Sequence, residues 1–231
     1  MQKHIIITGA SRGIGFETAK YLAEKNHQVF AIARSEDKLN NLKSFAPGLI
    51  HTIVTDLTDP DSGLKIAEVL KRKNLKIDGL INNAGLLINK MFLDLTDEDW
   101  QKQLDVNLLA PVRLVRDLIT FFNKNAHILN ISSMGGFQGS AKFPGLTGYS
   151  ASKGALSILT ECLSAELADH KIVSNCLCLG AVQTEMLENA FPGMEAPIEA
   201  EDMGEFIGNF LLNNHKFYNS RILPVALNDP E

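Results

Sequence analysis

The sequence predicts an α/β fold in which a doubly wound sheet of seven parallel strands is flanked by helices on both faces. Apolar, β-branched runs of strand length alternate with longer stretches in which apolar residues recur at intervals of three and four. The connections between these segments are short, which is typical of βαβ units. Because no linker rich in Pro, Gly or Ser divides the 231 residues, we expect a single domain over residues 1–231.

The predicted strands are short apolar runs that suit a sheet buried on both faces. They cover residues 4–8, 28–33, 50–55, 79–82, 127–132, 171–177 and 221–225. Helical spacing predicts helices between them over residues 13–25, 35–43, 60–73, 96–122, 149–169 and 199–212. These helices should cover both faces, because helical crossovers are what join parallel strands.

Two segments fit neither pattern. Residues 134–148 contain five glycines, and residues 182–197 contain two prolines. Both follow predicted strands, so they should lie at the carboxyl edge of the sheet, where open parallel sheets bind ligands. We interpret them as substrate loops, a pocket wall and a lid, and the alternative is two mobile surface loops.

Composition excludes several classes of protein. The 22 Lys and Arg residues against 27 Asp and Glu give a formal net charge of -5, which argues against nucleic acid as a partner. No apolar run is long enough to span a membrane or to form a signal-peptide core, so we expect a cytoplasmic protein without membrane contact. The three cysteines are interpreted as reduced thiols. Cys176 and Cys178 lack a matching Cys/His pair, so no metal site is predicted.

A glycine-rich turn, T-G-A-S-R-G-I-G at residues 8–15, joins the first strand to the first helix. Gly9 and Gly13 permit a tight path and a close approach of the backbone to a pyrophosphate, and Gly15 lets the helix pack against the sheet. The start of the helix offers free N–H groups to phosphates. We therefore predict a dinucleotide site of the Rossmann type, to which Ser11, Arg12 and Ile14 also belong, rather than an ordinary turn.

The choice of dinucleotide follows from the end of the second strand. An NAD enzyme places an acid there to bind the ribose 2′-hydroxyl, whereas this chain has Arg34. A guanidinium can pair with a 2′-phosphate, and Arg12 in the glycine turn can do so from the other side. NADP(H) is therefore predicted in preference to NAD(H). Alone, Arg34 would be read as an exposed surface arginine.

Polar and small residues follow the next two strands. Asp56 and Leu57 come after the third strand, and an aspartate at that place can accept an adenine amino proton. Asn83, Ala84 and Gly85 come after the fourth strand, where small residues let the backbone approach a ribose. The alternative for either motif is a turn or a helix cap.

The residues predicted to react come later. Tyr149 and Lys153 are four apart in a helix and so share a face. The pKa of a free phenol is about 10, and lowering it to near 7 requires about 4 kcal/mol of preferential stabilisation of the phenolate. The lysine and a cationic nicotinamide can supply this stabilisation. Ser133, at the end of the fifth strand, can bind a carbonyl oxygen. Asn107 is an amide in an apolar helical stretch, where it serves either a water chain from Lys153 or a helix kink.

With these motifs in order, the sequence resembles the short-chain dehydrogenase/reductase family of the classical type from residue 3 to about 225. The resemblance implies a catalytic tetrad of Asn107, Ser133, Tyr149 and Lys153, with Lys153 also bonding the nicotinamide ribose. It implies hydride transfer with NAD(P)H and a homodimer or homotetramer. It also places Val182 and Thr184, after the sixth strand, at the cofactor.

Three departures from the family pattern concern the ends of strands and one loop. Leu179 stands where the family usually has proline. Ser133 and Tyr149 are sixteen residues apart, roughly three more than the family pattern, so the glycine-rich loop carries an insertion. The last strand lacks the common Asp-Gly-Gly ending, which argues against a tetramer built along that strand.

We therefore expect NADP(H)-dependent conversion between a carbonyl compound and an alcohol, with Tyr149 as general acid and base. An apolar pocket wall is expected from Phe137, Phe143, Leu146, Met186, Leu187, Phe191 and Met194. A 3-oxoacyl-carrier-protein reductase is one alternative, with a thin basic docking patch at Lys124, His127, His170 and Lys171. The other is a non-catalytic NADP-binding sensor or scaffold protein.

Overall fold

The computed structural model describes residues 1–227, and these residues form one sheet of seven strands in the order β3-β2-β1-β4-β5-β6-β7. All neighbouring strands pair in parallel. The strands are β1 (His4–Thr8), β2 (Gln28–Ala33), β3 (Ile50–Val54), β4 (Ile77–Asn82), β5 (Phe122–Ser133), β6 (Val173–Leu179) and β7 (Arg221–Val225). The strand order reverses between β1 and β4, which is the switch point where doubly wound sheets bind ligands.

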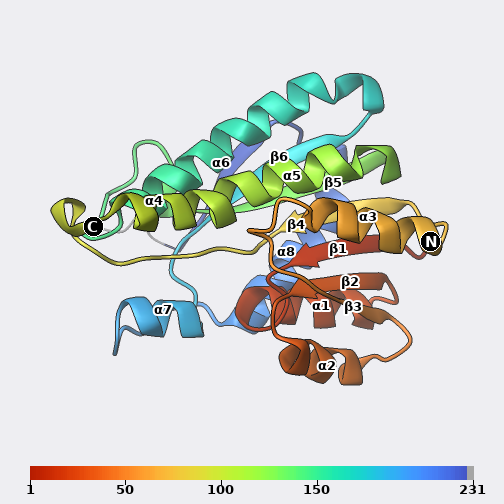
Figure 1. Cartoon of the computed structure of the whole chain (residues 1–231), viewed down its shortest axis with the longest axis horizontal. Helices are drawn as coiled ribbons and strands as arrows, with labels where there is room; N and C mark the ends of the chain where they lie inside the picture. Colours follow the sequence, from red (N-terminus) through yellow and green to blue (C-terminus); the bar gives the residue numbers. More distant parts are fainter. Residues whose placement is uncertain (228–231) are drawn as a thin grey trace.

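Helices cover both faces of the sheet (Figure 1). They are α1 (Gly13–Glu24), α2 (Glu36–Phe45), α3 (Ser62–Arg72), α4 (Asp97–Leu104), α5 (Ala110–Leu118), α6 (Thr147–Glu166), α7 (Glu185–Ala190) and α8 (Ala200–Asn213). In Figure 1, α4, α5 and α6 run above the strands, and α7 stands apart from the sheet at the lower left. The predicted fold class is therefore confirmed.

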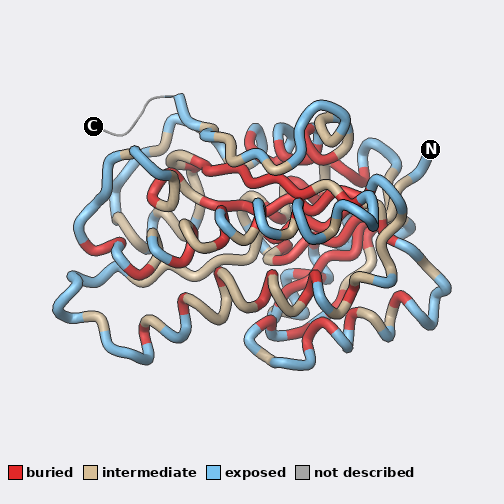
Figure 2. Tube along the Cα trace, turned by 90° about the horizontal axis from the view of Figure 1, so that it is seen from above, coloured by how far each residue is buried: buried red, intermediate tan, exposed pale blue. Residues whose placement is uncertain are grey.

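The core follows from the alternation of side chains along each strand. Ile5 and Ile7 pack with α1, α2 and α8 on one face, whereas Ile6 packs with α3 and α5 on the other. All three isoleucines are completely buried. Figure 2 shows the buried residues concentrated along the strands and the inner sides of the helices. The strands are thus fixed firmly enough to position the polar residues that follow them.

The predicted helix over residues 96–122 is wrong as a single element. It ends as α4 at Leu104, continues through the π-helical turn η2 (Asp105–Leu109), and resumes as α5. Asn107 lies in this wider turn because its amide group binds backbone outside the helix. The chain then leaves the helix after Leu118, and β5 begins at Phe122, five residues before the predicted strand.

One further difference lies in a segment predicted to be a loop. The segment at 182–197, predicted to be a loop, contains α7. The side chain of Thr184 caps this helix by accepting a hydrogen bond from the Leu187 amide. On the edge strand β7, the Val225 carbonyl accepts from the Gly180 amide. The neighbouring residue Pro224 is exposed, and because it has no N–H it offers no backbone donor at the open edge of the sheet. Within residues 1–227, no helix is both long and apolar enough to cross a bilayer.

Candidate active site

A cavity of about 1100 Å³ opens at the carboxyl ends of β1 to β6. It is bordered by the glycine turn, the segments that follow β2, β3 and β4, the end of β5, the start of α6, and α7. Of the predicted site residues, Gly15 and Asn107 do not line it, and all the others do. The sequence motifs therefore meet at one place, as a doubly wound sheet requires.

The glycine turn is packed tightly against the segment after β4. Gly9 has φ +68° and Gly13 has φ +55°, both in the left-handed region that favours glycine. A Cβ on Gly9 would lie 2.9 Å from the Ala84 Cα. The Asn83 side chain donates to the Thr8 carbonyl at 3.0 Å, which ties the two segments together. The turn is a cradle that a side chain would fill, and so it fits a closely approaching pyrophosphate.

Gly15→Ala is expected to disrupt this cradle. The new Cβ would lie 2.4 Å from the Asn83 amide nitrogen and 2.6 Å from the Gly9 carbonyl. We expect a loss of stability of about 1–3 kcal/mol from overpacking, and a loss of at least about tenfold in dinucleotide affinity from misplaced N–H donors. Thermal unfolding and fluorescence titration measure the two effects. Gly48→Ala is the control because no heavy atom lies within 4 Å of its added Cβ. Equal affinities in both variants would contradict this account.

One end of the cavity is cationic. Arg12, Arg34 and Lys38 line it, and we refer to these three residues as the cation cluster. Arg34 approaches the Asp56 carboxylate at 3.9 Å, and Lys38 approaches the Glu185 carboxylate at 3.6 Å.

Lys38 was not identified from the sequence. The sequence did contain a signal for it, namely a serine at position 35 that can cap a helix. In the structure, the Ser35 hydroxyl caps α2 by accepting from the Lys38 backbone N–H at 3.4 Å. That cap places Lys38 in the first turn of a helix that begins beside Arg34.

Ser133, Tyr149 and Lys153 meet at the centre of the cavity. The Lys153 ammonium donates to the Ile131 carbonyl at 2.7 Å and lies 5.9 Å from the centre of the Tyr149 ring. Burial lowers the pKa of Lys153 to about 8, against the opposing effect of the thiols of Cys176 and Cys178. Lysine, tyrosine and serine are thus close enough to act on one substrate atom.

Burial governs the pKa of Tyr149 within the chain itself. Desolvation raises it to about 12, and a hydrogen bond with Ser133 only partly opposes the rise. The Lys153 ammonium donates to a backbone carbonyl and is not among the groups that shift this pKa. Tyr149 is therefore a neutral phenol at pH 7, which suits a proton donor better than a base.

Asn107 is fully buried behind this group. Its side-chain oxygen accepts from the Leu86 amide at 2.8 Å, and its nitrogen donates to the Leu86 carbonyl at 2.9 Å. The same nitrogen also donates to the Ser152 hydroxyl at 2.9 Å. Asn107 thus joins η2, the segment after β4 and α6, and we class it as a positioning residue in this geometry. The helix is interrupted at Asn107, as the kink alternative expects, and the water chain from Lys153 stays a prediction.

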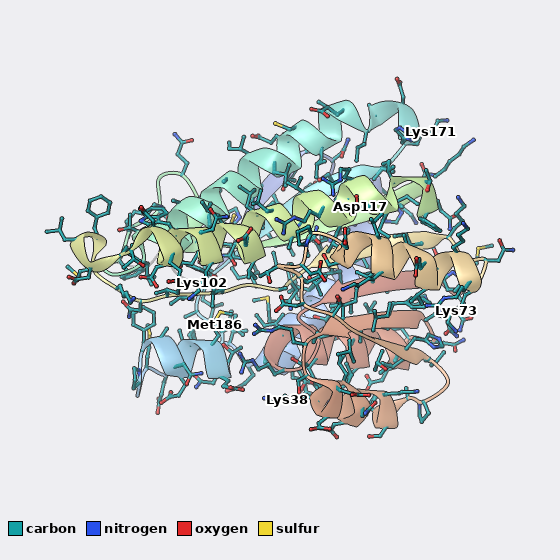
Figure 3. The ribbon with its side chains drawn as sticks, in the orientation of Figure 1. Lys38, Lys73, Lys102, Asp117, Lys171 and Met186 are labelled. Atoms are coloured by element: carbon teal, nitrogen blue, oxygen red, sulfur yellow. The ribbon has the colours of Figure 1, made fainter. Side chains whose placement is uncertain are left out.

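The other end of the cavity is apolar. Phe143, Leu146, Met186, Leu187, Phe191 and Met194 line it as predicted, together with Leu86, Leu87 and Val106, which the sequence did not indicate. Phe137 packs instead against Met134, Cys176 and Cys178, so its assignment to the pocket wall was wrong. Figure 3 shows Met186 on α7, between this helix and the body of the protein.

The segment that contains Asn89 and Lys90 contacts both α7 and the glycine-rich loop at the apolar end. The Asn89 side chain donates to the Ala190 carbonyl of α7 at 2.9 Å. The next backbone amide, from Lys90, donates to the Gly145 carbonyl of the glycine-rich loop at 3.0 Å. Both predicted substrate loops therefore border the cavity and contact the same short segment.

The predicted carrier-docking patch lies elsewhere. Lys124 is near the beginning of β5, nine residues and about 30 Å of strand from Ser133. His127 is buried, and Lys171 lies at the far end of α6 from α7 (Figure 3). None of the four predicted patch residues lines the cavity. The four residues lie near the amino ends of β5 and β6 or inside the sheet, whereas the cavity lies at the carboxyl ends of the strands.

A glycine turn, a cationic end and a tyrosine–lysine pair over one cavity of a doubly wound sheet define a dinucleotide-binding oxidoreductase. The chain belongs to the short chain dehydrogenase family, whose sequence model matches residues 3–195. The predicted family is thereby confirmed.

Individual relatives support the same family and fold. The chain is 32% identical to a 3-oxoacyl-(acyl-carrier-protein) reductase of Thermotoga maritima, over 80% of this chain and 76% of that protein. A solved mutant of 4-hydroxyisoleucine dehydrogenase, complexed with NADH and succinate, is 26% identical with a TM-score of 0.86 over 97% of both chains. A 3-ketoacyl-(acyl-carrier-protein) reductase from Brucella melitensis complexed with NADH is 24% identical, with a TM-score of 0.87 over 97% of this chain and 96% of that chain.

Proposed function

We propose that the protein is an NADP(H)-dependent oxidoreductase that reduces an uncharged, apolar carbonyl compound to an alcohol, with Tyr149 as the general acid. The observation that carries the proposal is that Ser133, Tyr149 and Lys153 line the same cavity as the cation cluster and the apolar residues. A bound NADPH would supply the hydride. The cradle formed by Gly9, Gly13 and the start of α1 would hold its pyrophosphate.

The reacting residues divide the work by their chemistry. Tyr149 is protonated at neutral pH and gives its proton to the carbonyl oxygen, while the Ser133 hydroxyl donates a hydrogen bond to the same atom. The cationic Lys153 stabilises the phenolate that remains. Asn107 holds α6 and the segment after β4 in register.

The preference for NADP(H) rests on the cation cluster. Three cationic side chains gather at the end of the cavity next to β2, where a 2′-phosphate would lie, and Arg34 stands where a ribose-binding acid would repel that phosphate. The NADH in the two neighbouring structures makes this preference a point to be measured rather than assumed.

The preference for an uncharged substrate rests on the absence of charged residues, within residues 1–227, from the apolar end. The charged residues of the whole cavity lining are Arg12, Arg34, Lys38, Asp56, Lys153 and Glu185. All except Lys153 belong to the cationic end, as their contacts show. A carboxylate bound beside Phe143 and Leu187 would lose its hydration without gaining a partner. The alternative 3-oxoacyl-carrier-protein reductase is favoured by the Thermotoga maritima relative.

The test combines cofactor titration with a matched pair of substrates. NADPH should bind at least about tenfold more tightly than NADH, and Arg12→Gln/Arg34→Gln should abolish the difference. With NADPH, kcat/KM for ethyl 3-oxohexanoate should exceed that for 3-oxohexanoate by about a hundredfold. A higher value with the carrier-bound 3-oxoacyl thioester than with either would favour the carrier reductase. Tight NADPH binding without turnover on any carbonyl compound would favour the sensor or scaffold protein.

A further inference from the structure

Glu185 reaches from α7 into the cation cluster. One of its carboxylate oxygens, Oε1, accepts from the Arg12 guanidinium, and the other, Oε2, lies 3.6 Å from the Lys38 ammonium. These two cations come from different elements, Arg12 from the glycine turn and Lys38 from the first turn of α2. A single carboxylate therefore bridges two cations across the mouth of the cavity, as the oxygens of a phosphate could.

The same cations are the donors available to a 2′-phosphate. Arg34 already has Asp56 at 3.9 Å, so Arg12 and Lys38 are the members of the cluster that Glu185 engages. A donor that is paired with Glu185 is not free to bind the phosphate. The carboxylate and the phosphate are thus alternative anions for one pair of cations.

The position of Glu185 couples this competition to the substrate pocket. Glu185 is the first residue of α7, directly after the capping residue Thr184, whose methyl group would lie 3.4 Å from a Cβ on Gly13. The next residues, Met186 and Leu187, line the apolar end. The contacts of Glu185 therefore hold the start of α7 against the glycine turn, and their loss would free the helix that covers the substrate.

We propose that Glu185 is an intramolecular competitor of the cofactor 2′-phosphate, and that NADPH displaces it from Arg12 and Lys38 and so releases the start of α7 from the glycine turn. This inference rests on the proposed use of NADP(H). It makes Glu185 a determinant of cofactor specificity.

The expected effect is modest because the groups are half exposed. The side chains of Arg12, Glu185 and Lys38 are 48%, 50% and 50% exposed, so solvent screens both pairs. Removing a competitor that occupies the site for most of the time tightens the apparent affinity by about threefold to tenfold. The gain should shrink at high ionic strength, where the pairs with Glu185 are already weakened.

The test compares Glu185→Gln with Glu188→Gln in the full chain, by fluorescence titration with NADPH and with NADH at low and high salt. Glu188 lies on the same helix and its side chain accepts from the Gly193 amide, a bond that glutamine retains. We expect Glu185→Gln to bind NADPH about threefold to tenfold more tightly at low salt. NADH affinity should stay within about twofold of that of the unmodified protein, and Glu188→Gln should match it for both cofactors.

Several results would overturn the proposal. Weaker NADPH binding by Glu185→Gln would mean that Glu185 assists the cofactor rather than competing with it. An equal gain in affinity for NADPH and NADH would mean that Glu185 does not compete with the 2′-phosphate. An equal gain in NADPH affinity in Glu188→Gln would mean that the effect comes from the change in net charge. Failure of the proposed function is distinguishable from these, because the unmodified protein would then bind NADPH no better than NADH.

Discussion

Replacement of Tyr149 by phenylalanine is expected to lower kcat for carbonyl reduction by about a thousandfold, within the range contributed by a positioned general acid. Phenylalanine keeps the ring at the start of α6, so NADPH affinity should stay within about twofold. The physical reason is that Tyr149 has its pKa raised to about 12 by desolvation and enters the reaction with its proton in place. Stopped-flow or steady-state NADPH oxidation measures the loss.

Two further measurements make this result specific. Tyr218→Phe removes a hydroxyl from a residue that stacks on Phe210 away from the cavity, and it should retain full activity. In the unmodified protein, reduction should slow as pH rises through about 8, because Lys153 has its pKa lowered to that value by burial and then loses its charge. Appreciable turnover by Tyr149→Phe would show that another group, or water, supplies the proton.

Mild acid is expected to destabilise the protein through His127. This histidine is buried and bonded at both ring nitrogens, to the Leu211 carbonyl at 3.1 Å and to the Asn175 side chain at 3.0 Å. Burial lowers its pKa to about 4; the bond to Leu211 opposes the shift, whereas His215 and Lys3 add to it. The unfolded chain binds a proton near pH 6.5, so stability is full above that value and falls as pH drops toward 4. The total loss is about 3 kcal/mol.

Chemical denaturation at pH 7 and pH 5 tests this prediction. His127→Gln should be less stable at pH 7, because a core contact is lost, but its free energy of unfolding should change less between the two pH values. The comparison is between slopes, because the pKa values of His27, His51 and His215 are lowered by burial as well. His170→Gln, at an exposed histidine, is the control. An unchanged slope in His127→Gln would assign the acid sensitivity to other groups.

Local patterns predicted the strands and the glycine turn well. β1, β2 and β7 occupy the predicted residues because short apolar runs bounded by turn residues have few alternative conformations. Periodicity could not reveal η2, since a π turn interrupts the spacing by one residue and apolar residues continue on both sides. Asn107 was the single local signal, an amide where the helix should be apolar.

Apart from Lys38, the site residues missed from the sequence are those that depend on tertiary contacts. Glu185 meets Arg12 across 173 residues of chain, and Asn89 meets Ala190 across 101. No spacing rule connects such pairs. The desolvation of Tyr149 could not be predicted for a similar reason, since it comes from the packing around the start of α6. Charge and burial at a site are properties of the packed chain rather than of a motif.

The π turn at Asp105–Leu109 makes the length of the chain, as well as its side chains, a requirement of the site. Each residue of an α-helix turns the chain by about 100°, and a π turn accommodates one residue more than a regular turn. Deleting the extra residue would let α4 and α5 join as one regular helix without the wider turn. The Asn107 amide would then leave Leu86 and Ser152. A shortened variant would lose the bonds through which Asn107 joins the segment after β4 to α6, even though none of the residues that line the cavity is changed.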